Sequence, residues 1–106
     1  MEVFGFEING VRTMKFHTSQ NPTWFFRRFM NYCIDNHLPQ ITIDERFHAF
    51  LSPAPNDPIF GAAIGTAALS EHNGIYYSTY NATPQKIGIM VHLANLLDLE
   101  FHVFTI

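Results

Sequence analysis

The sequence contains little cysteine and no long hydrophobic run. Cys33 is the only cysteine among 106 residues, so no intramolecular disulfide can form, which favours a reducing compartment. Residues Met1–Gly10 hold no basic segment followed by an apolar core, so we expect no signal peptide. The longest weakly polar run, Ile59–Leu69, is far shorter than the ~20 residues of a membrane-spanning helix. We therefore expect a cytoplasmic protein that does not cross a membrane.

Charge is also scarce. Charged side chains make up 14% of the chain, whereas about a quarter is usual for a domain. The net charge is −3 and there are only six Lys and Arg residues, while phosphate binding relies on several cations that release counterions together. The composition therefore disfavours nucleic-acid binding through Lys15, Arg27 and Arg28.

Aromatic residues are abundant instead. Eleven Phe, four Tyr and one Trp exceed the six Lys and Arg plus nine Asp and Glu, an imbalance that points to a partner surface. There is no internal repeat or low-complexity tract, and a chain of this length can bury roughly 65% of its unfolded surface. We expect residues 1–106 to form a single small α+β domain.

The first structural signal is a β-hairpin. Glu2–Ile8 and Val11–His17 flank Asn9-Gly10, the dipeptide that best accepts the positive φ values of a type I′ turn. A two-residue loop pairs Ile8 with Val11, Glu7 with Arg12, Phe6 with Thr13 and Phe4 with Lys15. Phe4, Phe6, Ile8 and Val11 then share one face of the hairpin.

A helix is predicted from Asn21, with Pro22 at its first turn, to about Asn36. Phe26, Phe29, Met30 and Cys33 fall on its apolar side. Trp24, Arg28, Asn31 and Asp35 follow one another at helical spacing on the solvent side, beside Arg27.

The middle of the chain predicts shorter elements. Thr42 and Glu45 have capping-box spacing, which favours a short helix over 43–51 with Ile43, Phe47, Phe50 and Leu51 on one face; a strand over Arg46–Leu51 is the alternative. Pro53, Pro55 and Pro58 form a stiff loop. A second helix is expected over Ile59–Ser70, which Asn73-Gly74 would end.

The C-terminal third reads as strand, helix, strand: Ile75–Tyr80, Gln85–Leu97 and Leu99–Ile106. Thr83 and Pro84 open the helix. We expect these to form a right-handed parallel β-α-β unit that joins the hairpin in a mixed sheet of about four strands, packed with three to four helices. The polar sector of the last helix is only Gln85, Gly88, His92 and Asn95, so it must be buried on two sides. The second cover is either the helix that begins at Asn21 or a symmetry mate, and we expect a homodimer.

The candidate partner-binding residues are of types that dominate binding hot spots, or that supply amphipathic contact area. They are Trp24, Arg27, Arg28, Asn31, Asp35, Tyr76, Tyr77 and Tyr80.

A metal or ligand site is the competing interpretation. Glu45 and His48 have the Glu-x-x-His spacing by which one helical turn offers a carboxylate and an imidazole to a metal, but only one such motif is present. His92 or Tyr80 would complete a pocket around them. A solvated helix face is the better explanation of Glu45 and His48, and we expect no cofactor.

Two further motifs favour structure over chemistry. Cys33 lies mid-helix among apolar residues, where a thiol is inert. Gly61–Thr66 resembles a glycine-rich phosphate loop but lacks the lysine of a P-loop, so we interpret it as close packing.

The sequence thus favours a non-catalytic protein-interaction module, and a phage- or plasmid-encoded inhibitor of a larger protein machine would fit. The alternative is a small metal- or ligand-dependent enzyme or ligand-binding domain with its pocket near Glu45 and His48.

Overall fold

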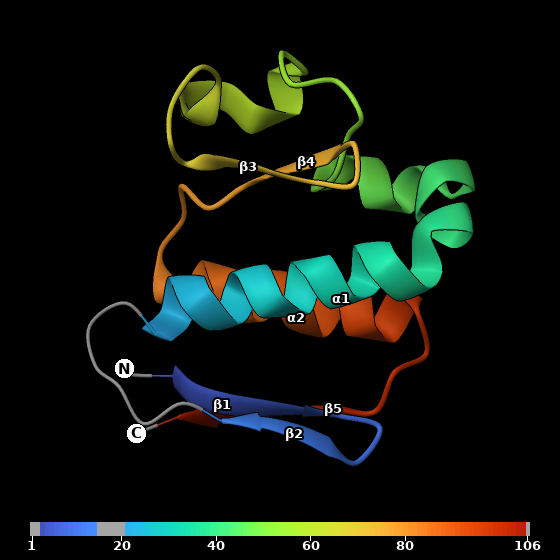
Figure 1. Ribbon diagram of the computed structural model, residues 1–106, viewed down its shortest axis with the longest axis vertical. Helices are drawn as coiled ribbons and strands as arrows, with labels where there is room; N and C mark the ends of the chain where they lie inside the picture. Colours follow the sequence, from blue (N-terminus) through green and yellow to red (C-terminus); the bar gives the residue numbers. More distant parts are fainter. Residues whose placement is uncertain (1–2, 15–20, 106) are drawn as a thin grey trace. The chain divides into compact units, whose positions relative to one another are not determined.

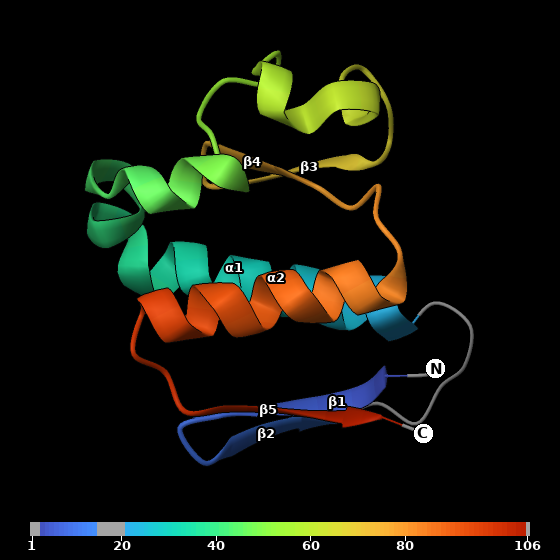
Figure 2. The same cartoon turned by 180° about the vertical axis from the view of Figure 1, so that it is seen from behind.

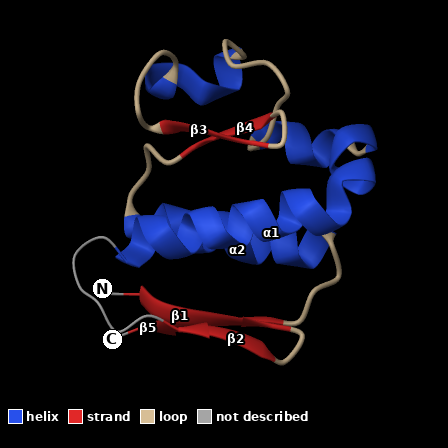
Figure 3. Cartoon of the chain, viewed as in Figure 1, coloured by secondary structure: helices blue, strands red, loops and turns tan. Residues whose placement is uncertain are grey.

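The computed structural model describes residues 3–14 and 21–105, with elements in the order β1–β2–α1–η1–η2–β3–β4–α2–β5 (Figure 1). The chain divides into two compact units: Met1–Phe29 with Ala82–Ile106, and Met30–Asn81. Helices and strands occur in both units (Figure 3), which confirms the α+β class. No helix in the described ranges is long and apolar enough to cross a membrane.

The first unit contains a three-stranded antiparallel sheet in the order β2-β1-β5, made of β1 (Val3–Ile8), β2 (Val11–Met14) and β5 (Phe101–Thr105). The predicted hairpin is confirmed, because Asn9 and Gly10 have φ values of 49° and 84° and Ile8 pairs with Val11. The expected partner of Phe4, Lys15, lies outside the described residues. Val11 is 71% exposed despite its place opposite Ile8, since it begins an edge strand.

Two helices cover one face of this sheet. Figures 1 and 2 show α2 (Thr83–Leu96) beside the first turns of α1 (Asn21–Ile43) on the same side of the strands. Phe6 of β1 meets Phe25 and Phe29 of α1 edge-on, with ring centroids 6.0 and 6.2 Å apart. The Phe101 ring of β5 lies 4.8 Å from that of Phe29. These rings form the aromatic core of the unit.

The last helix begins as predicted at Thr83-Pro84, where the Gln85 side chain accepts a hydrogen bond from the Ala82 N–H at 2.8 Å. Its buried face includes Lys86, whose ammonium lies 5.9 Å from the centre of the Phe26 ring. Burial lowers the pKa of Lys86. The helical pattern did not predict that Lys86 is buried. Its burial is possible because the alkyl stem packs like an apolar side chain.

The predicted parallel β-α-β unit and mixed four-stranded sheet are wrong. β5 pairs antiparallel with β1, with Phe6 opposite Val103 and Ile8 opposite Phe101, while Ile75–Ser78 belongs to a separate two-stranded sheet. The physical reason is a contact between distant residues. Pairing with β1 packs the Phe101 ring against the rings of Phe6 and Phe29, and no local sequence pattern indicates this packing.

Helix α1 continues beyond its predicted end at Asn36. Its regular part breaks at His37, with φ −134° and ψ 23°, two residues before Pro39, and a second helical segment then runs to Ile43. Proline is compatible with a first helical turn because its missing N–H has no partner there. Thr42 lies inside this second segment and its hydroxyl donates to the carbonyls of Leu38 and Pro39.

The second unit continues with two 3₁₀ helices. The first, η1 (Glu45–Ala49), is capped by Asp44, whose carboxylate accepts from the Arg46 N–H at 3.0 Å, so the expected cap at Thr42 is wrong. The alternative strand over Arg46–Leu51 is wrong as well. Phe47 and Leu51 are buried as expected, but Ile43 is 82% exposed.

The predicted helix over Ile59–Ser70 is largely replaced by other structure. Only η2 (Pro58–Ala63) is helical, and it breaks at Gly61, where φ is 50°; Gly65 also has a positive φ of 75°. The chain then enters β3 (Leu69–His72) and returns as β4 (Ile75–Ser78). Strand β4 confirms most of the strand predicted over Ile75–Tyr80. Glycines free to adopt positive φ end the helix, because no side chain resists the turn.

Candidate functional site

A pocket of about 250 Å³ lies beside η1 in the second unit. It adjoins Glu45 and His48, the pair that the sequence suggested for a ligand or metal site. Its lining combines aliphatic and polar side chains: Ile41, Thr42, Ile43, Asp44, Glu45, His48, Leu51, Ser52, Pro53 and Ile75.

The cap of η1 positions the two candidate side chains. Asp44 both accepts from the Arg46 backbone and forms an ion pair with the Arg46 guanidinium at 2.6 Å. This contact lowers the pKa of Asp44. Residues three apart in a 3₁₀ helix eclipse one another, so Glu45 and His48 project on the same side.

His48 is held by an acid from the proline-rich loop. Its Nε2 lies 2.7 Å from Oδ2 of Asp57, which also accepts from the buried Ser52 hydroxyl at 2.8 Å. The other Asp57 oxygen accepts from the Ile59 N–H at 3.1 Å. The hydrogen bond from His48, followed by those from Ile59 and Ser52, lowers the pKa of Asp57.

The state of Asp57 determines which nitrogen of His48 carries the proton. An ionised carboxylate has no hydrogen to donate, so Nε2 of His48 must be the donor to Asp57. On a neutral imidazole the other nitrogen, Nδ1, is then a hydrogen-bond acceptor. Ser52 also donates to Asp57 and not to His48, so this arrangement does not activate the serine as a nucleophile.

We expect the stability that Asp57 contributes to depend on pH. Its folded-state pKa lies below 3.8, the ordinary value, so this contribution is complete above that pH and is lost as the pH falls through the folded-state pKa. Urea unfolding from pH 6 to pH 2.5 is expected to show a stability gap between wild type and Asp57→Asn that narrows below about pH 4. A gap that stays constant over this range would contradict the assignment.

A metal centre has little support at this site. Among the described residues, no three His, Cys, Asp or Glu side chains gather closely enough to hold a metal ion. His92 and Tyr80, which were expected to complete the pocket, do not line it.

Trp24 and Arg28 form a stacked pair in the first unit. The Arg28 guanidinium carbon lies 4.5 Å from the centre of the Trp24 ring, and the Phe25 ring meets that of Trp24 edge-on at 4.8 Å. Arg27 and Arg28 are exposed, and neither forms an ion pair with another described residue. Three of the predicted partner-binding residues, Trp24, Arg27 and Arg28, therefore lie close together on one segment of α1.

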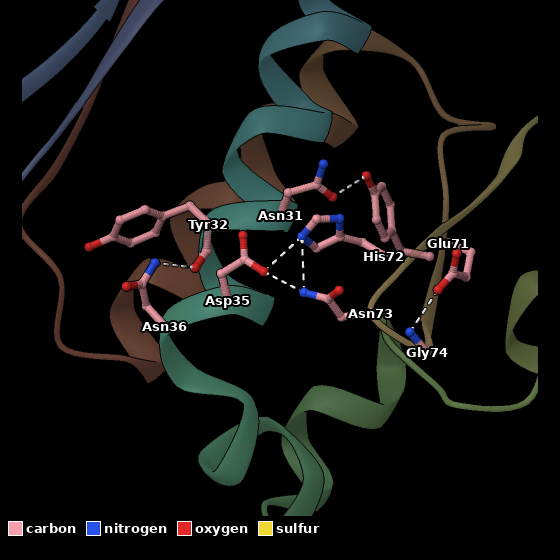
Figure 4. A network of polar contacts seen from close by, with 9 residues as sticks. Asn31, Tyr32, Asp35, Asn36, Glu71, His72, Asn73 and Gly74 are labelled. Atoms are coloured by element: carbon pink, nitrogen blue, oxygen red, sulfur yellow. Dashed lines mark hydrogen bonds and ion pairs between the residues drawn. The ribbon is translucent and has the colours of Figure 1, made fainter.

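Asn31 and Asp35 instead make internal contacts in the second unit (Figure 4). Oδ1 of Asp35 accepts from the Asn73 amide at 2.6 Å and lies 2.8 Å from Nε2 of His72. Asn31 accepts from the hydroxyl of Tyr77, which is 2% exposed. These contacts attach the β3–β4 hairpin to α1 through the side-chain oxygen of Asn31 and one carboxylate oxygen of Asp35.

The other candidate residues differ in exposure. Tyr80 is 72% exposed, whereas Tyr76 is half-buried and its backbone pairs with that of Ser52. His92 is exposed on α2. Cys33 is buried as expected, and desolvation raises the pKa of its thiol to about 12.

The sequence did not point to Ser52, His72 or Asn73 as parts of polar networks. Asn73 carried a usable signal: with Gly74 it repeats the Asn-Gly dipeptide of the first hairpin, and the pair has φ values of 50° and 81°. The Asn73-Gly74 pair forms the turn between β3 and β4, so its predicted role as the end of a helix is wrong. The partners of His72 and Ser52 lie far along the chain or across a loop and leave no local pattern.

No protein-family model matches this sequence, and no curated protein or solved structure is significantly similar to it.

Proposed function

We propose that this protein is a non-catalytic interaction module that binds an acidic segment of a larger protein through Trp24, Arg27 and Arg28. The observation that carries the proposal is the stack of the exposed Arg28 on the half-buried Trp24, with the exposed Arg27 beside it. Trp and Arg are the residue types most enriched in binding hot spots. A guanidinium that stacks through its flat face keeps its N–H donors free at the edge.

The chemistry of the stack favours a carboxylate-bearing partner. Arginine binds carboxylates through two parallel hydrogen bonds, which makes such pairs both directional and strong. Neither Arg27 nor Arg28 forms an ion pair with an acid among the described residues. Their charges are therefore not neutralised within that part of the chain. Because stacking already restricts the Arg28 side chain, binding would cost less conformational entropy than for a mobile arginine.

The wider hypothesis adds three points. We propose that the partner is a larger machine that the protein inhibits, that the protein acts in the cytoplasm, and that it does so as a homodimer. Val91, exposed on the largely apolar α2, supports a second copy as cover for that helix. Tyr80 is a further candidate contact.

We expect the Trp24–Arg28 stack to be decisive for binding. Tagged protein would be used to capture its partner from source cells, and the isolated partner would then be titrated against purified variants. Trp24→Ala and Arg28→Gln are each expected to weaken binding at least about 30-fold, the effect of a hot-spot residue. Light scattering on the same preparations would report whether the protein is a dimer.

Arg12→Gln is the matched control. It removes one positive charge from an exposed side chain of the same unit, and this arginine is already paired with Glu7 at 3.2 Å. Equal losses for Arg12→Gln and Arg28→Gln would indicate a general charge effect. Full binding by the Trp24→Ala and Arg28→Gln variants would contradict the proposal.

A further inference from the structure

We propose that the pocket beside η1 binds a small organic cation with an apolar body, such as a primary amine that carries one ring. This binding site is separate from the Trp24–Arg28 stack and does not rest on the proposed function. The proposal follows from three features of the pocket: its aliphatic wall, the hydrogen-bonding state of its polar side chains, and its volume.

The wall is formed by aliphatic side chains from three segments. Ile41, Leu51 and Ile75 are buried in the protein and each contributes to the lining. Ile43 stands at the same pocket and is 82% exposed. An apolar group in the pocket would be removed from water together with part of Ile43, and burial of apolar surface is the main favourable term in such binding.

The hydroxyl hydrogens of the polar side chains in the pocket are already donated within the chain, and the Ser52 oxygen also accepts from the Ala54 N–H at 3.1 Å, which leaves Thr42 and His48 as acceptors. The Thr42 hydroxyl donates to backbone carbonyls, and the Ser52 hydroxyl donates to Asp57. Nε2 of His48 is engaged by the same aspartate, so a neutral His48 presents Nδ1 as an acceptor. A ligand that binds these groups must therefore supply the hydrogens.

The charge of the pocket is negative. Asp44 and Glu45 both line it, and Asp44 is paired with Arg46, which does not. Glu45 is exposed and forms no ion pair with another described residue. An ammonium group satisfies both requirements, because it carries a positive charge and three donors and has no acceptor.

The volume limits the size of the ligand. About 250 Å³ corresponds to roughly eight water molecules at about 30 Å³ each, and it lies below the usual range of pockets for drug-sized ligands. A nucleotide or an extended cofactor would not be enclosed. A single ring or a short branched chain joined to an amine would.

The test is an NMR titration of the full chain with three probes at low ionic strength. 2-Phenylethylamine combines ring and charge, 3-phenylpropionate keeps the ring and reverses the charge, and ethylamine keeps the charge without the ring. We expect saturable amide shifts from 2-phenylethylamine, centred on Asp44–Ser52, and at least about fivefold weaker binding of the other two probes. Equal affinity for 3-phenylpropionate, or no saturable binding of 2-phenylethylamine, would overturn the proposal.

A pair of charge-removing variants locates the cation. Glu45→Gln keeps the size of an exposed side chain and is expected to weaken 2-phenylethylamine binding about three- to fivefold. Glu100→Gln makes the same change at an exposed position in the other unit and is expected to leave binding unchanged. If the two variants bind the probe equally well, the site is not beside Glu45 and the proposal fails.

Discussion

Replacement of Phe29 by alanine is expected to lower the free energy of unfolding by about 3–5 kcal/mol, the range for loss of a large buried aromatic side chain. Phe29 is fully buried, and its ring contacts those of Phe6 and Phe101, which belong to two different strands. The substitution therefore removes contacts that join α1 to the sheet and leaves a cavity where the surrounding rings cannot fully collapse. Urea denaturation would measure the change.

Val11→Ala is the control for this experiment. Val11 is a strand residue in the same unit but is largely exposed, so its truncation is expected to change stability by no more than about 0.5 kcal/mol. A similar loss for both variants would mean that the aromatic core does not hold the first unit together.

Tyr77→Ala is expected to have a comparable effect in the second unit, about 3–5 kcal/mol. Tyr77 is buried on β4, and its hydroxyl donates to Asn31 of α1 at 2.9 Å. Tyr77→Phe keeps the ring and removes only the hydroxyl, so it is expected to cost about 1 kcal/mol. The difference between the two variants separates the packing of the ring from its hydrogen bond.

Tyr77→Ala also tests whether residues 1–106 behave as one domain, as we propose. Trp24, the single tryptophan, lies in the first unit, whereas Tyr77 lies in the second. Helix α1 passes from Phe29 to Met30 without interruption, so we expect the units to unfold together. Tyr77→Ala should then shift the unfolding transition seen by Trp24 fluorescence. An unchanged Trp24 transition would show that the units unfold separately.

Several elements were predictable because their signals are local. Asn9-Gly10 specifies a type I′ turn, and with it the pairing of Glu7 with Arg12. Thr83-Pro84 marks the start of α2, and the predicted apolar face of α1 holds Phe26, Phe29, Met30 and Cys33, which are all buried.

The errors have two physical causes. Over Ile59–Ser70, Gly61 and Gly65 adopt positive φ values, which end the helix that the local pattern predicts. For β5, the choice of partner depended on aromatic packing between residues about a hundred positions apart. Parallel pairing with β4 fits the order of the elements, but it would not bring Phe101 onto Phe6 and Phe29.

The candidate site was predictable only where its residues lie close together in the sequence. Glu45 and His48 lie three residues apart on one short helix, so their proximity was visible in the sequence. The hydrogen bond between His48 and Asp57 was not visible, because the two residues lie nine positions apart and the path of the loop between them, which contains Pro53 and Pro55, depends on the packing around it.

By itself, then, the sequence determined the α+β class, the Asn9-Gly10 turn, the last helix and the aromatic composition of the core, because each depends on backbone preferences or on residue spacing within a few positions. Only the tertiary structure decided that the strands form two antiparallel sheets, that Asp35 and Tyr77 make internal contacts, and that a pocket opens beside Glu45 and His48. Those outcomes depend on which distant surfaces bury the most apolar area together, a comparison between alternative folds that no short segment contains.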